Sequence, residues 1–185
     1  MPTEVYERAR MCALMGLHIL NTEPEERFDK ITRAAKERLK VPISTITTIS
    51  DDKEWFKSVQ GLKQKESPRE VSFCGHALLN RGMFIVYDTL EDPDFMDNPL
   101  VLGDPYIRFY AGKALIEYDS NMPVGVFCIK DTKPRNLSGR ELDIFLGFAE
   151  QAEKEINRNN RLRGLDETDG IEFNPETPDE PGALV

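Results

Sequence analysis

Two cysteines and a histidine are the residues of this chain whose types could support covalent or metal chemistry. Cys74 and His76 lie two positions apart, and Cys128 follows much later. On an extended segment Cys74 and His76 would point to one face, whereas at the start of a helix they would lie about 200° apart. A thiolate beside an imidazole can act as a nucleophile, and Cys128 could complete a set of three metal ligands.

The same three residues have a structural interpretation, which we favour. Buried cysteines commonly serve as small apolar side chains, and a histidine can bond a nearby backbone group. A structural zinc site needs four ligands and supporting hydrogen bonds, and no fourth ligand accompanies this set. We therefore expect no bound metal and assign no catalytic residue.

Arg108 lies in a segment that also contains Tyr106 and Tyr110. On a strand these three side chains would share one face. An Arg–Tyr set can orient an anionic small ligand through paired hydrogen bonds. Alternatively, Arg108 pairs with a carboxylate such as Asp88 and fastens a loop to a sheet. The sequence leaves both interpretations open.

Aromatic residues gather in and around two long segments, residues 61–82 and 89–106, which are rich in Gly, Pro and Asp. Long segments of this kind in a compact domain are commonly functional. Aromatic walls with a few polar anchors are typical of small-molecule sites, whereas core packing is the alternative for each single ring. The rings that could line a pocket are Trp55, Phe56, Phe73, Phe95, Phe109 and Tyr110.

Three helices are predicted around these residues. The spacing of Val5, Ala9, Cys12, Met15 and Ile19 predicts an amphipathic helix over residues 4–20. A second helix is expected to begin at Thr22, because Glu25 stands at the capping-box distance and Pro24 suits a first turn. Its apolar stripe would be Phe28, Ile31, Ala35 and Leu39, and Pro42 would end it.

A last helix is expected from Ser138, with Glu141 completing a capping box. Its apolar face would be Leu142, Phe145, Phe148 or Ala149, Ala152 and Ile156. Strands are expected between the helices, because β-branched and aromatic runs with short connections indicate a mainly antiparallel sheet. They are residues 43–49, 54–59, 84–88, 107–111, 114–118 and 124–130.

Composition fits one domain without a nucleic-acid partner. The 185 residues are 39% hydrophobic and 31% charged, a globular balance. A net charge of −9 argues against binding to a phosphate backbone. No apolar run approaches the ~20 residues of a membrane span, and three scattered cysteines form no disulfide framework. We expect a cytoplasmic protein with a domain over residues 1–163 and an acidic, disordered tail over residues 164–185.

Between Trp55 and Asp131 the motifs occur in an order that resembles a GAF domain. The series includes Ser72-Phe73-Cys74-Gly75-His76, Asp92-Pro93-Asp94-Phe95, Arg108-Phe109-Tyr110-Ala111-Gly112 and Gly125-Val126-Phe127-Cys128. The resemblance covers residues 5–160 and implies an α+β fold related to PAS domains. It would have a central antiparallel sheet of five or six strands, terminal helices on one face, and a lid with a ligand pocket on the other.

The resemblance also implies a site and a function. Candidate ligand-binding residues are Trp55, Phe73, Cys74, His76, Asp88, Phe95, Asn98, Arg108, Tyr110 and Cys128. The family shows no single ligand, so the cofactor stays open; Gly75 separates Cys74 from His76, which argues against a linked bilin. No kinase or cyclase signature occurs in the chain.

We therefore expect a small-molecule-sensing signalling domain that acts on an output protein, such as a histidine kinase or cyclase. We also expect a homodimer formed by the N-terminal and C-terminal helices together. The alternatives are a ligand-free dimerisation module and, less favoured, a thiol-dependent methionine sulfoxide reductase that uses Cys74 and Cys128.

Overall fold

The computed structural model describes residues 3–158, and the proposed tail lies outside them. Six strands form one antiparallel sheet in the order β3-β2-β1-β6-β5-β4. The helices are α1 (Glu4–Gly16), α2 (Glu26–Leu39), α3 (Phe73–Asn80), α4 (Pro99–Leu102) and α5 (Gly139–Ile156), with a 3₁₀ turn at Arg69–Val71. The strands are β1 (Ile43–Ile49), β2 (Lys53–Gln60), β3 (Glu66–Pro68), β4 (Met83–Val86), β5 (Phe109–Glu117) and β6 (Met122–Asp131).

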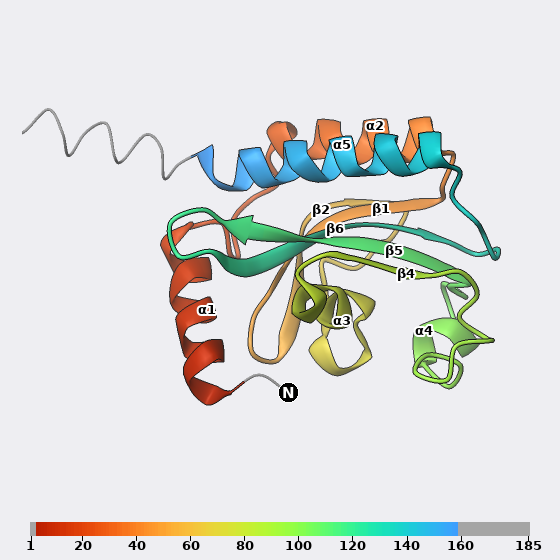
Figure 1. The fold of residues 1–185 in the computed structure, drawn as a ribbon, viewed down its shortest axis with the longest axis horizontal. Coiled ribbons are helices and arrows are strands. Elements are labelled where there is room, and N and C mark those ends of the chain that lie inside the picture. Colours follow the sequence, from red (N-terminus) through yellow and green to blue (C-terminus); the bar gives the residue numbers. More distant parts are fainter. Residues whose placement is uncertain (1–2, 159–185) are drawn as a thin grey trace, which may run out of the picture.

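The sheet separates two layers. Helices α2 and α5 lie side by side across one face, while α3 and α4 lie on the other (Figure 1). We call residues 61–82 and 89–106, which carry α3 and α4, the lid. The expected α+β fold with a central antiparallel sheet is confirmed, and the helices that cover the face opposite the lid are α2 and α5. The predicted strands 107–111 and 114–118 are one continuous strand, β5, with an irregular register between Leu115 and Ile116.

Each face of the sheet has its own apolar core. On the helix side α2 packs over β1 and β2 and α5 over β5 and β6, and Phe28, Ile31, Phe145 and Ala149 join one buried cluster. On the lid side Phe73, Cys74 and Phe95 pack against the opposite face of the same strands. Both faces of β1 and β6 are therefore covered, which explains why the two strands are buried along almost their whole length.

Of the two predicted capping boxes, one is confirmed and one is wrong. Ser138 and Glu141 form the predicted capping box of α5. Helix α2 begins at Glu26 rather than near Thr22, and Glu25 occupies the cap without a side-chain hydrogen bond. The Thr22 hydroxyl is used elsewhere, because it donates to the Ile19 carbonyl and accepts from the buried Lys57 ammonium. The Thr22 hydroxyl therefore does not cap α2, because it is bonded to Ile19 and Lys57.

Helix α1 buries a different face from the predicted one. Val5 and Met15 are 79% and 63% exposed, whereas Arg10 and Leu14 are fully buried. The Arg10 guanidinium donates to the Ile49 carbonyl at 2.6 Å and to Glu7 at 2.9 Å. Since these partners satisfy a buried guanidinium, an arginine can lie on the inner face. Periodicity of apolar residues alone could not identify that face.

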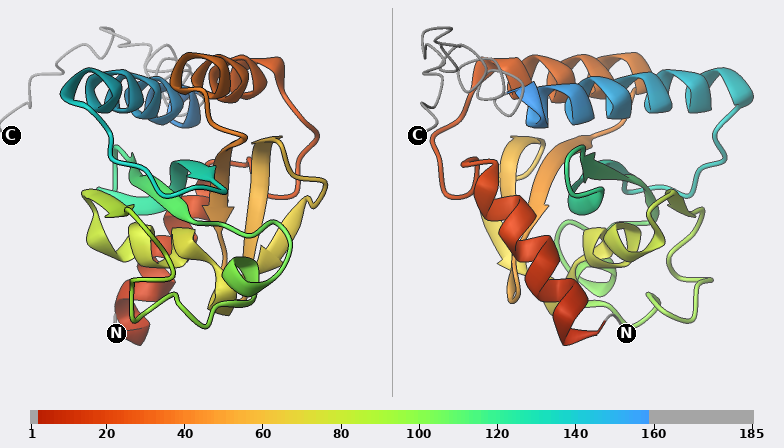
Figure 2. Two further views of the ribbon diagram at one scale, coloured as in Figure 1. Left: turned by 90° about the vertical axis from the view of Figure 1, so that its right-hand side faces the viewer. Right: turned by 60° about the vertical axis from the view of Figure 1, so that its left-hand side comes forward.

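Helix α1 also reaches the lid. It descends from the helix layer past the end of the sheet (Figure 2), and its Glu7 carboxylate accepts from Arg69 at 3.1 Å. Arg69 itself donates to the Ser50 carbonyl at 3.2 Å. The Glu7 carboxylate thus connects α1, the turn after β1 and the segment that leads into α3.

We expect Glu7→Gln to lower the free energy of unfolding by ~2 kcal/mol at pH 7, because charge-assisted hydrogen bonds to Arg10 and Arg69 are lost. Burial raises the pKa of Glu7, but the bonds from Arg69 and Arg10 outweigh it, and the pKa is lowered. A lowered carboxyl pKa stabilises the fold above the unfolded-state pKa and loses that effect as pH falls through the folded-state value. The difference from wild type should therefore shrink below about pH 4.

Urea denaturation at pH 7 and in acid checks this expectation. Glu4→Gln is the matched control, because Glu4 pairs with Arg8 on the exposed side of the same helix. That substitution should change stability by less than ~0.5 kcal/mol. Equal losses for the two variants would contradict a special role for Glu7.

Candidate functional site

The start of α3 places a cysteine directly over the sheet. Ser72 caps the helix by accepting from the backbone amides of Cys74 and Gly75, at 3.1 and 3.3 Å. The same hydroxyl donates to the Glu54 carboxylate of β2 at 2.5 Å. The capping residue is therefore tied to the sheet, and the first turn of α3 points the Cys74 side chain inward.

Four side chains then meet between lid and sheet, and we call them the thiol cluster: Thr45, Cys74, Tyr110 and Cys128. The sulfur atoms of Cys74 and Cys128 lie 3.6 Å apart. The Tyr110 hydroxyl donates to the Cys74 sulfur at 3.3 Å, and the Thr45 hydroxyl lies 3.1 Å from the Cys128 sulfur. Strands β1, β5 and β6 supply Thr45, Tyr110 and Cys128, since Thr45 and Gly112 pair with Cys128 in adjacent ladders, and α3 supplies Cys74.

Aromatic rings seal the cluster from the lid side. Phe73 stacks on Phe95 with ring centroids 4.4 Å apart and on Tyr110 at 5.2 Å. Gly112 makes room for the Tyr110 ring, because a β-carbon there would lie 2.2 Å from the Tyr110 hydroxyl oxygen. Phe73, Phe95 and Tyr110 are at most 1% exposed. Of the predicted aromatic wall, Phe73, Phe95 and Tyr110 thus form a packed layer on the lid side, whereas Phe109 belongs to the core on the helix side.

A buried lysine lies beside the cluster. Lys130 is two positions after Cys128 on β6 and therefore on the same face; it is 3% exposed. Among residues 3–158 its ammonium has no hydrogen-bond or ion-pair partner, and the Phe56 ring centroid lies 5.7 Å away. Burial works against its charge, but the thiols of Cys128 and Cys74 and the Glu54 carboxylate raise the pKa of Lys130. The group therefore carries a positive charge under the lid.

The two thiols differ in acidity. Burial and the adjacent Cys128 sulfur raise the pKa of Cys74 well above its ordinary value. Burial also opposes ionisation of Cys128, but hydrogen bonding from Cys74 and the Lys130 charge outweigh it and lower the Cys128 pKa. Burial and the neighbouring sulfur atoms raise the pKa of Tyr110, so its hydroxyl stays a donor. Cys128 is consequently the thiol that ionises first.

The Arg108 guanidinium is occupied by Asp88. Its Nε and Nη2 donate to the two Asp88 oxygen atoms at 2.9 and 2.7 Å. Hydrogen bonding from Arg108 lowers the pKa of Asp88. Of the two interpretations that the sequence left open, the geometry matches the ion pair that fastens a loop. Tyr106 is 58% exposed and does not join Tyr110.

Asn98 and His76 also lie away from the sulfur atoms. Asn98 caps α4 by accepting from the Leu100 amide at 2.9 Å, and it donates to the Val71 carbonyl at 3.0 Å. It therefore joins the two lid segments. His76 lies on the outer side of α3, with its ring centroid 4.8 Å from that of Phe95. Because Cys74 and His76 are on a helix, they point apart.

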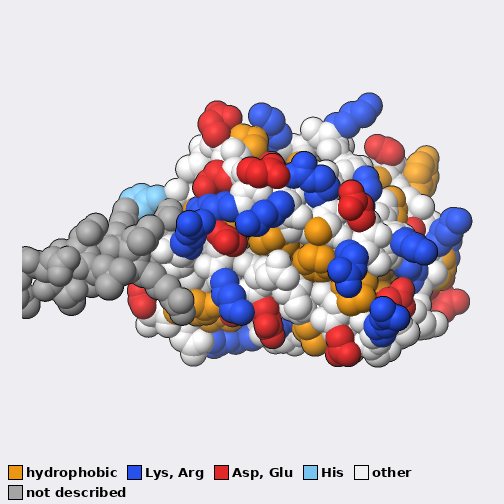
Figure 3. All heavy atoms as spheres, turned by 90° about the horizontal axis from the view of Figure 1, so that it is seen from above, with side chains coloured by type: hydrophobic (Ala, Val, Ile, Leu, Met, Phe, Trp, Pro, Cys, Tyr) orange, Lys and Arg blue, Asp and Glu red, His pale blue; other side chains and the backbone are white. Residues whose placement is uncertain are grey.

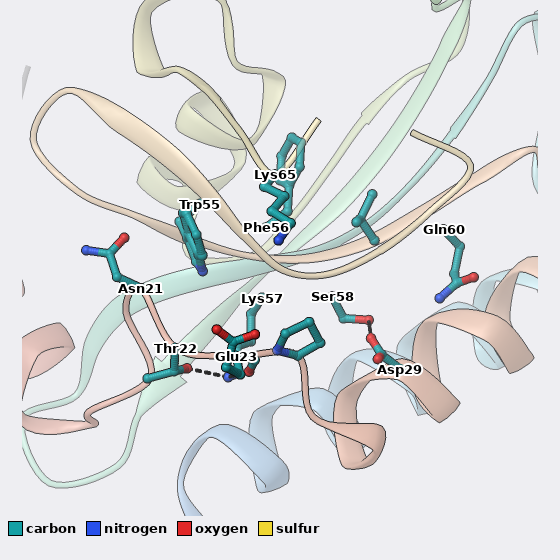
Figure 4. A pocket seen from close by; sticks show the side chains of 12 residues that line it. Asn21, Thr22, Glu23, Asp29, Trp55, Phe56, Lys57, Ser58, Gln60 and Lys65 are labelled. Carbon is teal, nitrogen blue, oxygen red and sulfur yellow. Dashed lines mark hydrogen bonds between the residues drawn. The ribbon is translucent and has the colours of Figure 1, made fainter. Parts of the chain in front are cut away.

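Trp55 lies on the opposite side of the sheet from the lid. Its ring borders a pocket of about 220 Å³ between β2 and the segment before α2, with Asn21, Thr22 and Lys57 (Figure 4). A register shift in the β1–β2 ladder after Ile46 accompanies this placement, since Lys57 and Ser58 both turn toward α2. The expectation that Trp55 lies under the lid is therefore wrong.

We expect Trp55→Ala to cost ~1–2 kcal/mol, because the half-buried ring loses only part of the transfer free energy of a fully buried one. Guanidinium denaturation of both proteins measures this. The lid should be unaffected, so hydrogen exchange in α3 should match wild type. A cost near 4 kcal/mol with a more mobile α3 would show that the ring supports the lid after all.

The sequence interpretation missed Lys130 and Glu54. The available signal was the period of two along β6, which places Lys130 on the face of Cys128. Glu54 Oε1 is buried without a hydrogen-bond partner among the described residues. Within residues 3–158 no group of three or more His, Cys, Asp and Glu side chains is arranged to hold a metal ion. None of the helices in that range combines the length and apolar character needed to cross a membrane.

Similar proteins support the fold and identify the family. The model of the GAF domain family matches residues 23–156. A cyclic di-GMP phosphodiesterase of Pseudomonas aeruginosa is 34% identical over 166 residues, which are 89% of this chain and 28% of the phosphodiesterase. The chain thus spans little more than a quarter of that relative.

Two solved structures share the fold. One is the GAF domain of a phosphoenolpyruvate-protein phosphotransferase from Coxiella burnetii, with TM-score 0.61, 14% identity, and coverage of 86% of this chain and 98% of the other. The second is a type II free methionine-R-sulfoxide reductase from Thermoplasma acidophilum, with TM-score 0.56, 14% identity, and coverage of 81% and 96%. At 14% sequence identity, these two similarities show only that the chains share a fold. Because the family model matches most of the described residues, this chain belongs to the GAF domain family.

Proposed function

We propose that this chain is the small-molecule-sensing domain of a signalling protein. The observation that carries the proposal is the Lys130 side chain, which is 3% exposed and makes no ion pair or hydrogen bond with another of residues 3–158. Buried charges are normally paired directly, whereas the Lys130 charge is favoured only by the longer-range attraction of Cys128, Cys74 and Glu54. An anionic group of a ligand would compensate Lys130, and burial would make the attraction strong.

The surroundings favour a small polar ligand with an apolar part. Glu54 Oε1 is a buried acceptor without a partner, so a donor on the ligand could occupy it. Phe56, Phe73 and Tyr110 offer apolar surface. Because Phe73 and Cys74 now fill the space over the sheet, we propose that the ligand enters as α3 moves outward. Such a movement would pass to α1 through Arg69 and Glu7.

The test is native mass spectrometry of the full chain, together with thermal unfolding against a panel of small carboxylates, phosphates and amino acids. We expect one small molecule per chain, or a raised melting temperature with one chemical class. Lys130→Met should abolish the effect. Lys57→Met is the matched control, because Lys57 is also buried but is paired with Glu25 on the helix side. Absence of any bound molecule or shift would favour the ligand-free module.

For the output, we propose control of cyclic di-GMP turnover, on the strength of the 34% identity to the phosphodiesterase. The catalytic part would be supplied elsewhere in the polypeptide or by a partner. Cellular cyclic di-GMP should change when Lys130→Met is introduced into the native gene. Unchanged levels of the dinucleotide, with an altered phosphorylation state of a kinase instead, would point to the other expected output class.

We further propose that two copies pair through α5 and the outer face of α1. Half-buried Ile144 and Phe148 lie on α5, and apolar side chains are interspersed with charges over the helix layer (Figure 3). Deleting residues 1–20 is a poor test, because Leu14, Leu17 and Ile19 belong to the core. Phe148→Glu should instead convert a dimer to a monomer in light scattering, without loss of helical circular dichroism. A monomeric wild-type chain would remove the proposed interface.

A further inference from the structure

We propose that Cys74 and Cys128 form a reversible disulfide when a small peroxide reaches them, and that this bond locks the lid onto the sheet. Their sulfur atoms are 3.6 Å apart, already in contact, although 54 positions separate the residues in the chain. One sulfur lies on the first turn of α3 and the other on β6. A modest inward movement of α3 would bring the two sulfur atoms to bonding distance.

The groups around the sulfur atoms assign a different role to each. Cys128 is the attacking thiol, because Lys130 on the same strand face stabilises its thiolate and lowers its pKa. Cys74 is the resolving thiol, and the Tyr110 hydroxyl holds its sulfur in place by donating at 3.3 Å. Thr45 restrains the Cys128 sulfur from the neighbouring strand.

The reaction balances with a peroxide as oxidant. The Cys128 thiolate attacks one peroxide oxygen and breaks the O–O bond, which gives a sulfenic acid and an alkoxide or hydroxide; this anion takes up the proton that the Cys128 thiol had released and becomes an alcohol or water. The Cys74 sulfur then attacks the Cys128 sulfur, the S–O bond breaks, and the departing hydroxide takes the Cys74 proton to form water. Two thiols lose two electrons and two protons, and the peroxide gains both. A dithiol reductant reverses the reaction by thiol–disulfide exchange.

Access depends on lid opening, because both sulfur atoms are fully buried. Helix α3 has eight residues, and His76, Leu79 and Asn80 on its outer side are exposed. A short helix with one exposed side can open locally without global unfolding. A peroxide of nearly the size of water can then enter, whereas larger oxidants would react slowly. The bond would oppose the same outward movement of α3 that the proposed ligand requires.

The test uses the full chain, hydrogen peroxide and alkylation of the remaining thiols after denaturation. Wild type contains three cysteines, and after oxidation we expect one alkylated thiol, at Cys12, and a mass decrease of about 2 Da. A non-reducing digest should join the peptides that carry Cys74 and Cys128. Dithiothreitol should restore three alkylated thiols.

Three variants make the result specific. Cys12→Ser removes the exposed cysteine of α1 and should leave the cross-link intact, whereas Cys74→Ser and Cys128→Ser should each abolish it. Lys130→Met should slow cross-linking by on the order of tenfold. Oxidised wild type should melt about 10 °C higher than reduced wild type, since a long loop is closed in the unfolded chain.

Two outcomes would overturn the proposal. They are three alkylated thiols after peroxide treatment, and oxidation of Cys74 or Cys128 to sulfinic acid without a cross-link. Disulfide formation is scored by mass and does not require a ligand, so it can succeed even if the sensing proposal fails. If a ligand has been found, its affinity should fall at least tenfold in the oxidised protein.

Discussion

Replacing Phe95 with alanine is expected to lower the free energy of unfolding by ~3–5 kcal/mol, the range for truncating a buried phenylalanine. The Phe95 ring is 1% exposed and stacks on Phe73 at 4.4 Å. It also meets the His76 ring at 4.8 Å and the Phe84 ring at 5.9 Å. It therefore joins the second lid segment to α3 and to β4, and the cavity left by its loss would lie directly beneath the lid.

Chemical denaturation measures the cost, and hydrogen exchange locates it. Faster exchange is expected in α3 and residues 89–106, with little change in α2 and α5, because those helices pack on the other face. Phe95→Leu should recover more than half of the loss by refilling the volume. Tyr87→Ala is the control for loss of an aromatic ring, since Tyr87 is 53% exposed. A loss below 1 kcal/mol would mean that the lid collapses over the gap.

Lys130→Met and Lys57→Met are expected to change stability in opposite directions. Both side chains are almost completely buried, at 3% and 2% exposure. Lys57 has an ion pair with Glu25 at 2.6 Å and donates to the Glu23 carbonyl at 2.9 Å. Its replacement should cost ~2–3 kcal/mol, because these acceptors lose a charged donor. Lys130 has no such partners, so methionine should be neutral or stabilising by ~1–3 kcal/mol.

Urea denaturation at pH 7, without added ligand and with dithiothreitol present, measures the two effects. If Lys130→Met costs more than 1 kcal/mol, the ammonium must be neutralised in the resting protein, with the Cys128 thiolate as the nearest candidate. Cys128→Ser would then remove most of that cost. Such a result would weaken the argument for an anionic ligand and strengthen the assignment of Cys128 as the attacking thiol.

The sequence by itself determined the architecture. Runs of β-branched and aromatic residues predicted the strands, the Ser138 capping box predicted the start of α5, and the order of motifs indicated the GAF fold. These signals are local, because backbone conformation, capping and burial of one face depend on residues within a few positions. The sequence also allowed two local geometries for Cys74 and His76. Because α3 is a helix, the two side chains point apart.

Only the tertiary structure decided which side chains meet. Cys74 and Cys128 touch because the lid crosses β6, and no local pattern encodes that contact. Arg10 is buried because the Ile49 carbonyl, 39 positions away, accepts its hydrogen bond. Trp55 faces away from the lid, and this orientation accompanies the irregular register between β1 and β2. Lys130 is unpaired because no carboxylate of the described residues lies within ion-pairing distance. The physical reason is common to all four: burial and charge compensation depend on partners that are distant in the chain.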